Sequence, residues 1–281
     1  MAEVAVLGGG AWGTAVAQML ASDGRDVTLW ALEPEVVAEI NADHRNTRFL
    51  PDADLAPSIR ATGDLGDVAD AQVVLAVVPA QHLRKVLAQM PAFAGDLVIC
   101  AKGIEQSTGA LMSDAAHDAC PQATLAALSG PTFAHEVAAG LPAAVTLACE
   151  GGEEQWERLS PVIARPTFRP YYSADLIGAE IGGAVKNVLA IACGVVDGLA
   201  LGQNARNALI GEGQSAADLM ANRQTVAEGA HTAPVLQRLA RAEGIDMPIV
   251  DAVVALLEGA KAADIADALL ARPLTTERRP A

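Results

Sequence analysis

Three glycines near the start of the chain have the spacing of a dinucleotide-binding loop. Gly8, Gly10 and Gly13 form a G-x-G-x-x-G motif. The motif lies between an apolar, strand-like run at residues 4–7 and an Ala-rich helical pattern. The first glycine of such a loop permits a tight turn, the second lets backbone approach a pyrophosphate, and the third lets the helix pack closely on the strand. Because the helix N-terminus attracts anions, the motif predicts a dinucleotide site; the alternative is a structural glycine-rich turn.

The residues after the second apolar strand bear on which dinucleotide binds. A strand is expected at Asp26–Ala31. An acidic residue near its end commonly holds the ribose 2′-hydroxyl of NAD, whereas an arginine accommodates the 2′-phosphate of NADP. Glu33 lies at about the expected separation from the glycines, which favours NAD. NADP is kept as the alternative, because Arg45 and Arg48 follow soon after and because Glu33 also suits the start of a helix.

Lysine is scarce in this chain, so its positions are informative. Lys186 lies in a long apolar helical segment at residues 176–210 and is the only cation there before Arg206. Desolvation lowers the pKa of a lysine in such surroundings, which suits acid/base catalysis near neutral pH. The alternative is a lysine that extends its ammonium group to the helix surface.

Two further candidates follow strands at the edge of the sheet where ligands bind. Lys102 comes directly after an apolar strand at Leu97–Ala101. A cation there points into the ligand crevice, unless it is an ordinary solvated lysine. A turn at Ser129–Thr132 follows the next strand, and its N–H groups and hydroxyls suit polar contacts with substrate or cofactor, or it is only a tight turn. The four cysteines lack metal-ligand spacing, so no metal is expected.

An α/β pattern that gives way to helices positions these candidates. Short apolar strands alternate with helical stretches, which predicts βαβ units and a Rossmann-type, doubly wound parallel sheet. The strands are expected at residues 4–7, 26–31, 58–62, 72–78, 97–101, 123–128 and 143–148. From Asp175 onward the periodicity is helical. We therefore expect a dinucleotide-binding Rossmann domain at residues 1–173 and a smaller all-α substrate and catalytic domain at residues 174–281.

Composition narrows the class of protein. The chain carries a formal net charge of −15, and such an acidic field repels nucleic acid and anionic membranes, so an anionic small substrate must meet locally placed cations. No apolar run approaches the ~20 residues of a membrane-spanning helix. The N-terminus lacks the basic region of a signal peptide. We expect a cytoplasmic protein with reduced cysteines and no membrane insertion.

Several ordered motifs together resemble the bacterial NAD(P)-dependent glycerol-3-phosphate dehydrogenases. The motifs are G-G-G-A-W-G-T-A at residues 8–15, N-T-R-F-L-P at 46–51, A-V-V-P-A at 76–80, A-K-G-I at 101–104, L-S-G-P-T-F-A-H-E-V-A-A-G-L-P at 128–142, G-A-E-I-G-G-A-V-K-N-V-L-A-I-A-C-G at 178–194, G-Q-N-A-R-N-A-L-I at 202–210, V-A-E-G at 226–229 and R-P-L at 272–274. They cover nearly the whole chain.

The resemblance implies reversible hydride transfer between NAD(P)H and dihydroxyacetone phosphate, giving glycerol 3-phosphate for phospholipid synthesis. It implies that Lys186 is the catalytic acid/base. Substrate contacts are implied for Lys102, Gly130, Thr132, Lys186 and Asn187. Cofactor contacts beyond the three glycines and Glu33 are implied for Ala11, Trp12, Lys102, Ala134, Val226 and Glu228. A cation beside the reacting carbonyl agrees with this chemistry, because it stabilises developing alkoxide charge and supplies the proton.

Two positions depart from the family pattern. Leu32 stands where the family usually carries arginine, which favours NAD further. After Ile210 the chain passes directly to Gly211, whereas the family continues through a segment that bears an aspartate beside the catalytic lysine and an arginine for the substrate phosphate. Three explanations are open. The chain is a shortened relative with weak, altered or no activity, the sequence is closed up over a disordered loop, or a compact site is rebuilt, for example in a dimer.

These observations lead to three candidate functions. The first is the dehydrogenase with Lys186 as acid/base. The second is a related oxidoreductase for another 2-hydroxy or 2-keto compound, favoured if the phosphate-binding arginine is absent. The third is a catalytically weakened nucleotide-binding relative. In each case the expected partner is a small molecule, and a homodimer is expected because a second subunit would cover the apolar surface that a deletion exposes.

Overall fold

The computed structural model describes residues 3–185, 188, 227–261, 264, 265 and 268, without the side chains of residues 227 and 228. The chain divides into two compact units, Met1–Gly183 and Ala184–Ala281. Within the described ranges, no helix combines the length and the apolar character that crossing a membrane requires.

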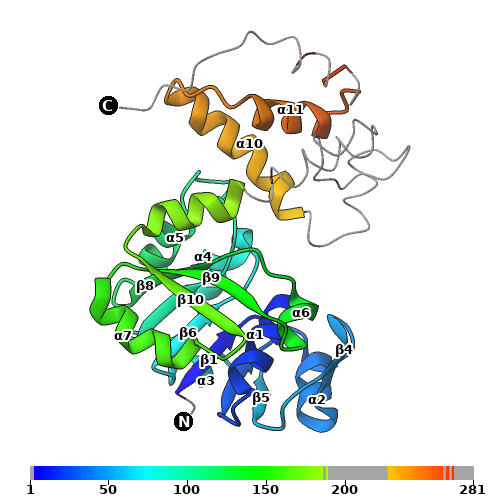
Figure 1. The fold of residues 1–281 in the computed structure, drawn as a ribbon, viewed down its shortest axis with the longest axis vertical. Coiled ribbons are helices and arrows are strands. Elements are labelled where there is room, and N and C mark those ends of the chain that lie inside the picture. Colours follow the sequence, from blue (N-terminus) through cyan, green and yellow to red (C-terminus); the bar gives the residue numbers. More distant parts are fainter. Residues whose placement is uncertain (1–2, 186–187, 189–226, 262–263, 266–267, 269–281) are drawn as a thin grey trace. The chain divides into compact units, whose positions relative to one another are not determined.

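The N-terminal unit is built on an eight-stranded sheet with the order β10-β9-β8-β7-β6-β1-β2-β5 (Figure 1). Its strands are β1 (Val4–Leu7), β2 (Val27–Trp30), β5 (Ile59–Thr62), β6 (Val73–Ala76), β7 (Asp96–Ile99), β8 (Thr124–Ser129), β9 (Ala143–Cys149) and β10 (Phe168–Ser173). β1 pairs in parallel with β2 on one side and β6 on the other, so the direction of winding reverses at β1. The carboxyl end of such a strand is where open α/β sheets bind ligands.

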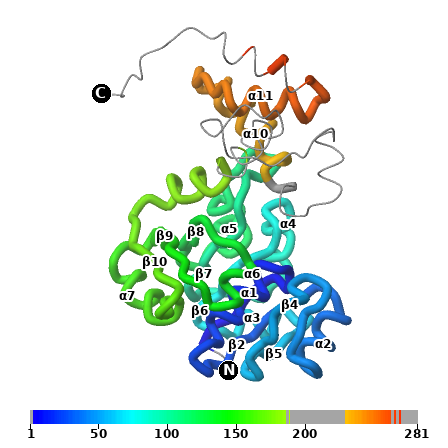
Figure 2. The backbone as a smooth tube through the Cα atoms, turned by 45° about the vertical axis from the view of Figure 1, so that its right-hand side comes forward, coloured from blue at the N-terminus to red at the C-terminus, as the bar shows by residue number. Residues whose placement is uncertain are grey.

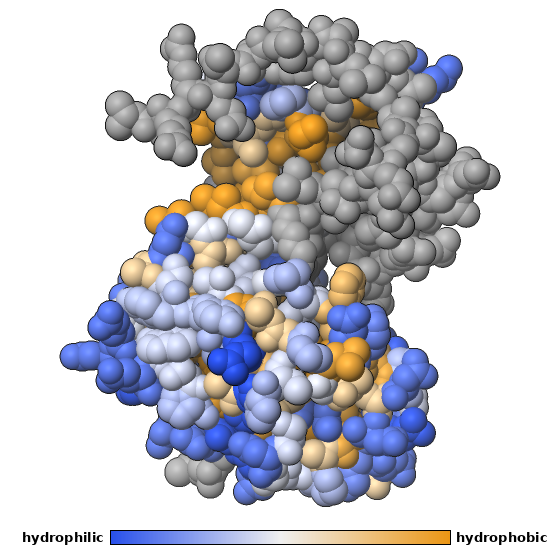
Figure 3. All heavy atoms as spheres, viewed as in Figure 1, coloured by the Kyte–Doolittle hydropathy of each residue, from blue (hydrophilic) through white to orange (hydrophobic). Residues whose placement is uncertain are grey.

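Helices cover both faces of the sheet (Figures 1 and 2). One face carries α1 (Ala11–Ala21), α2 (Pro34–Asp43), α6 (Ala134–Ala138) and α7 (Gly152–Ile163), and the other carries α3 (Leu65–Ala69), α4 (Ala80–Leu87) and α5 (Met112–Ala119). Val4 and Val6 belong to the first hydrophobic core, whereas Ala5 and Leu7 belong to the second, because successive strand residues point to opposite faces. The visible surface of this unit is mostly hydrophilic (Figure 3). The predicted doubly wound, Rossmann-type sheet is confirmed.

Three features of the sheet region differ from the sequence expectations. β9 runs antiparallel to β8, whereas an all-parallel sheet was expected. A small hairpin of β3 (Arg45–Asn46) and β4 (Leu50–Asp54) lies in a region where no strand was expected. β10 was not expected at all. Its sequence contains Pro170 and only Phe168 is buried, which is tolerated because β10 is an edge strand that need not donate every backbone hydrogen bond.

The described part of the C-terminal unit contains helices only, as the fold class predicts. α10 (Ala227–Ala242) packs against α11 (Pro248–Leu257). Pro248 starts α11, a position where its missing N–H costs nothing. A further helix begins at Leu176 and is continuous to residue 185, so it leads from the first unit into the second.

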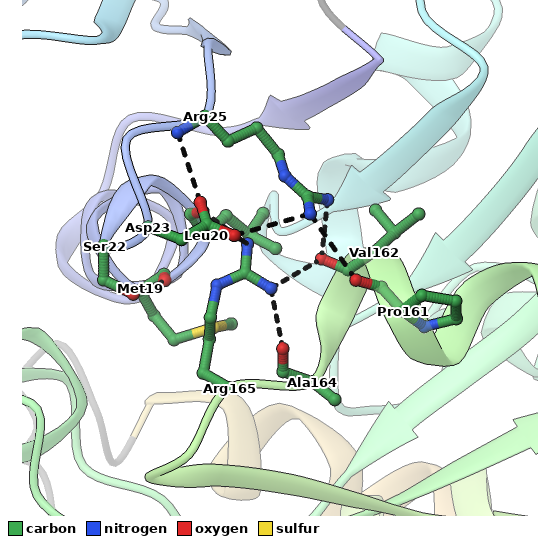
Figure 4. Close-up of polar contacts among 9 residues, drawn as sticks. All are labelled: Met19, Leu20, Ser22, Asp23, Arg25, Pro161, Val162, Ala164 and Arg165. Carbon is green, nitrogen blue, oxygen red and sulfur yellow. Dashed lines mark hydrogen bonds and ion pairs between the residues drawn. The ribbon is translucent and has the colours of Figure 1, made fainter.

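The C-terminal ends of α1 and α7 are joined by a buried arginine (Figure 4). Arg165 donates hydrogen bonds to three backbone carbonyl oxygens, those of Leu20, Val162 and Ala164. Its guanidinium also lies 3.3 Å from a carboxylate oxygen of Asp23, and its side chain is only 5% exposed. The last carbonyls of a helix have no partner within the helix. Arg165 therefore satisfies oxygens at the ends of two helices at once.

We expect Arg165→Met to lower the free energy of unfolding by roughly 2–4 kcal/mol, because it removes three hydrogen bonds from a charged donor and takes this donor away from the carbonyl oxygens of Leu20 and Ala164. The carbonyl oxygen of Val162 keeps a hydrogen bond from Arg25. Chemical denaturation measures this change. Arg60→Met is the matched control. Arg60 is 71% exposed and pairs with Asp67, so its loss should cost less than about 1 kcal/mol. Equal losses in the two variants would contradict a special role for Arg165.

Candidate functional site

Each glycine in the loop between β1 and α1 meets a different constraint. Gly8 has φ +134°, and a Cβ added there would lie 3.0 Å from the carbonyl carbon of Val77. A Cβ on Gly13 would lie 1.7 Å from the carbonyl oxygen of Gly8, so α1 packs directly on the loop. A Cβ on Gly10 would meet nothing within 4 Å. The loop is therefore tightly packed at its two ends and open at its middle glycine, the geometry that a pyrophosphate cradle requires.

The first turn of α1 is free of competing acceptors from side chains. Gly10 is the N-cap, it makes no side-chain cap hydrogen bond, and no acidic residue lies in the first turn. The N–H groups of that turn have no helical partner, so together with the helix dipole they form an anion-binding site. Ala11 and Trp12 are half-buried in this turn, and Trp12 packs against the core on the α1 face. The residues predicted to hold the cofactor phosphates thus surround one helix N-terminus.

The end of β2 presents a leucine and an acidic residue. Leu32 is 73% exposed, and Glu33 is the N-cap of α2. Arg48 forms an ion pair with Glu35 and lies 4.0 Å from a carboxylate oxygen of Glu33. Its guanidinium also lies over the ring of Phe49, at 5.1 Å from the ring centroid. The arginine nearest this strand end is therefore already surrounded by carboxylates.

Two of the predicted substrate residues are brought together. The Lys102 ammonium donates a hydrogen bond of 3.1 Å to the carbonyl oxygen of Gly130. This contact joins the segment after β7 to the turn after β8, at the carboxyl ends of two adjacent parallel strands. Thr132 is half-buried in the same turn. Ala134 starts α6, which packs against α1, so the turn also reaches the helix of the glycine loop.

α4 holds the loop that follows Lys102. The side-chain amide of Gln81 donates a hydrogen bond of 2.9 Å to the carbonyl oxygen of Ile104. The Nε of Arg84 donates to both carboxylate oxygens of Glu105, at 2.9 and 3.1 Å. This contact lowers the pKa of the buried Glu105 carboxyl. The lysine therefore lies on a loop that is fixed by side chains of a neighbouring helix.

A buried carboxylate anchors the helix that begins at Leu176. Glu180 accepts hydrogen bonds from the backbone N–H of Ser113, at 2.8 Å, and from its hydroxyl, at 2.5 Å. Burial raises the pKa of Glu180. One turn later, a Cβ added to Gly183 would lie 2.9 Å from the hydroxyl oxygen of Ser129. The helix therefore approaches the end of β8 closely, immediately before the segment that contains the predicted catalytic lysine.

Some predicted residues lie outside the described part of the chain. These are Lys186, Asn187 and Val226, together with the junction between Ile210 and Gly211. Glu228 is in α10, but its side chain is outside the described part as well. Among the residues that are described, no group of three or more His, Cys, Asp or Glu side chains could hold a metal ion. Cys100 is a free, buried thiol whose pKa is raised to about 12 by burial, so it is not a nucleophile.

Sequence reasoning missed three residues that hold the site. Arg165 fixes the far end of α1, Glu180 anchors the helix from Leu176, and Asn46 contacts the glycine loop. Each acts on a partner distant in sequence, so no local pattern points to it. The only signal in the sequence is that Asn46 and Glu180 belong to two of the motifs that carry the family resemblance, N-T-R-F-L-P and G-A-E-I.

Family models match both parts of the chain. The model described as the NAD-dependent glycerol-3-phosphate dehydrogenase N-terminus matches residues 3–155. The model of the C-terminus of the same family matches residues 175–215 and residues 209–267 as two overlapping stretches.

Individual relatives are similar to this chain over nearly its full length. Proteins named glycerol-3-phosphate dehydrogenase [NAD(P)+] from Erythrobacter litoralis and Novosphingobium aromaticivorans are each 58% identical to this chain, and the alignments cover 98% of both partners. The crystal structure of glycerol-3-phosphate dehydrogenase from Coxiella burnetii is similar with a TM-score of 0.85 and 29% identity, covering 96% of this chain and 98% of that chain.

The alignments are longer than the chain itself. The comparison with the Erythrobacter litoralis protein spans 324 positions, whereas this chain has 281 residues, so at least 43 positions hold no residue from this chain. The relatives therefore contain residues that have no counterpart here.

Proposed function

Because the chain belongs to the NAD-dependent glycerol-3-phosphate dehydrogenase family, we propose that it transfers hydride reversibly between NAD(P)H and dihydroxyacetone phosphate. The match of both family models carries this conclusion. The chain is an NAD(P)-dependent oxidoreductase. The product, sn-glycerol 3-phosphate, serves phospholipid synthesis. The glycine loop fits the cofactor, since it is open at Gly10 and closed at Gly8 and Gly13.

The residues have distinct roles in this reaction. The bound nicotinamide supplies the hydride that reduces the keto carbon. Lys186 donates a proton to the carbonyl oxygen as the alkoxide forms, and takes it back in the reverse direction. We propose that Lys102 contacts both substrate and cofactor; its hydrogen bond to the carbonyl oxygen of Gly130 supports the substrate contact. Substrate contacts come from Lys102, Gly130, Thr132 and Asn187, and cofactor contacts from Ala11, Trp12, Glu33, Ala134, Val226 and Glu228.

The family's C-terminal domain is shortened here near Ile210. Two observations support this proposal: the C-terminal family model matches in two stretches that meet at residues 209–215, and at least 43 aligned positions have no residue in this chain. The missing segment would carry the arginine for the substrate phosphate. An arginine binds phosphate through two charge-assisted hydrogen bonds. This acidic chain has few lysines and arginines that could replace it.

This shortening favours a second candidate function. A site without the phosphate-binding arginine would act on another 2-hydroxy or 2-keto compound, or would bind cofactor with little turnover. Following NADH and NADPH oxidation with dihydroxyacetone phosphate, and in parallel with unphosphorylated dihydroxyacetone, separates the candidates. Turnover of the phosphorylated compound alone supports the first function. Preference for the unphosphorylated compound, or cofactor binding without turnover of either, supports the second.

The cofactor preference is proposed to be NAD. We propose that Glu33, the N-cap of α2 at the end of β2, accepts a hydrogen bond from a ribose hydroxyl. The nearby Arg48 already forms an ion pair with Glu35. Arg45 lies 3.4 Å from Asp54, so it too has an acidic partner.

We expect a higher kcat/KM with NADH than with NADPH, and we expect Leu32→Arg to raise the NADPH to NADH ratio about 10- to 100-fold. The reason is that a new guanidinium gains charge-assisted hydrogen bonds to the 2′-phosphate. Leu32→Gln has a similar length without the charge, so it should leave the ratio nearly unchanged. A native preference for NADPH would contradict the proposal.

The roles of the two domains, the cellular location and the oligomeric state are also proposals. We assign cofactor binding to residues 1–173 and substrate binding and catalysis to residues 174–281. The helix from Leu176 belongs to the first compact unit as far as Gly183 and is tied to it through Glu180 and Ser113, whereas Lys186 comes later in the sequence. Cys100, Cys120 and Cys149 are free and buried, which suits the reducing environment of the cytoplasm.

We propose that the protein is a homodimer, and light scattering of the purified protein tests this.

A further inference from the structure

Asn46 is a fully buried polar residue at the edge of the glycine loop. Its side-chain amide nitrogen lies 2.9 Å from the carbonyl oxygen of Gly9 and 2.7 Å from the hydroxyl oxygen of Thr14. The Thr14 hydroxyl lies 3.3 Å from the same Gly9 oxygen. The amide oxygen of Asn46 accepts a hydrogen bond of 3.3 Å from the backbone N–H of Phe49. The side chain thus connects the β3–β4 hairpin to the loop.

The contact fixes the orientation of one peptide group. The carbonyl of Gly9 and the N–H of Gly10 belong to the same planar trans peptide, so they point in opposite directions. When Asn46 and Thr14 hold the Gly9 oxygen, the N–H of Gly10 is turned away from them. Gly10 is also the glycine with open space around its Cβ position. A glycine peptide has few steric preferences of its own, so an external tether is needed to keep one orientation.

We propose that Asn46 is a positioning residue for cofactor binding, which holds the Gly9–Gly10 peptide so that the loop presents its N–H group to the cofactor pyrophosphate. The inference rests on the proposed dinucleotide site. It gives the β3–β4 hairpin, which lies outside the glycine motif, a role in cofactor binding. The same short segment carries Arg48, which lies 4.0 Å from a carboxylate oxygen of Glu33, so the hairpin contacts both the glycine loop and the residue proposed to bind the ribose.

The test compares Asn46→Ala with Asn41→Ala. Asn41 makes two hydrogen bonds of 2.9 Å with the backbone of Ala61 and no described contact with the glycine loop, so it is matched in chemistry. We expect Asn46→Ala to raise the dissociation constant for NADH, measured by titration calorimetry, about tenfold, the loss that a missing buried hydrogen bond produces. Asn41→Ala also removes two side-chain hydrogen bonds, at an exposed position away from the glycine loop, and should leave the NADH dissociation constant within about twofold.

Thr14→Val provides a second test if Asn46→Ala does not fold, because it removes the other donor to the Gly9 oxygen and keeps the side-chain volume. It should weaken NADH binding about threefold. With the active variants, KM for NADH should rise while kcat at saturating NADH stays close to that of the native protein. Native-like NADH affinity in folded Asn46→Ala or Thr14→Val would overturn the proposal. A native protein that does not bind NADH would instead refute the proposed function.

Discussion

Replacing Lys186 with methionine is expected to lower kcat for dihydroxyacetone phosphate reduction about 10³- to 10⁴-fold. A positioned general acid contributes about 10²- to 10⁴-fold, and its charge also stabilises the developing alkoxide. Methionine keeps the length of the side chain but can neither donate a proton nor carry charge. The dissociation constant for NADH should stay within about twofold, because the phosphate cradle lies in the other unit, at the N-terminus of α1. Steady-state kinetics and a direct NADH titration measure both quantities.

Lys85→Met is the control for this substitution. Lys85 is an exposed residue of α4, so removing its ammonium group should leave both kcat and NADH binding unchanged. If Lys186→Met retained native turnover while Lys85→Met behaved as expected, another group would have to supply the proton. If the native protein turns over dihydroxyacetone phosphate only slowly and neither variant changes that rate, the result would favour the third candidate, a catalytically weakened nucleotide-binding relative.

Gly13→Ala and Gly10→Ala are both expected to weaken NADH binding, but only Gly13→Ala is expected to destabilise the fold. A Cβ at position 13 would lie 1.7 Å from the Gly8 carbonyl oxygen, a distance that no side-chain adjustment relieves because the obstacle is backbone. We expect the free energy of unfolding to fall by about 3 kcal/mol, with loss of measurable NADH binding because the loop must move. At position 10 the backbone has φ −71° and ψ −178°, which alanine adopts readily. Stability should be unchanged or rise by about 0.5 kcal/mol, while NADH binds at least tenfold more weakly because the Cβ occupies the approach to the pyrophosphate.

Chemical denaturation and NADH titration of both variants check this pair. The structural explanation of the loop would be wrong if Gly13→Ala were as stable as the native protein. The cofactor would approach elsewhere if Gly10→Ala bound NADH normally. Neither result depends on turnover, so the pair tests the cradle independently of the C-terminal unit.

The central sheet and the glycine loop are predictable from sequence because local requirements determine them. The buried strands read as short apolar runs, and Gly8 and Gly13 meet backbone atoms that lie within a few residues or next to the adjacent strand. β10 escapes such prediction since its only buried residue is Phe168, and an edge strand with one anchored side chain has no alternating pattern. The β3–β4 hairpin is not predicted because β3 has only two residues and β4 has only one buried residue, Leu50, followed by proline and aspartate.

The residues that hold the site cannot be found in the same way, because their partners lie far away along the chain. The contact of Asn46 with Gly9 spans 37 residues, that of Glu180 with Ser113 spans 67, and that of Arg165 with Leu20 spans 145. Nothing near Arg165 in the sequence distinguishes it from a surface arginine, although its side chain is only 5% exposed. Such tethers depend on the completed fold, so a sequence pattern predicts the element and not the contact.

The two ends of α1 are fixed by different chemistry. Backbone packing of Gly13 on Gly8 holds its N-terminus, and the Arg165 guanidinium holds its C-terminus. Restraints at both ends oppose sliding or unwinding of the helix when a ligand binds. The anion-binding turn is therefore preorganised, and association with the cofactor loses little conformational entropy in this part of the protein. We propose that selectivity between related cofactors then depends on the side chains around Leu32 and Glu33, which lie outside the glycine loop.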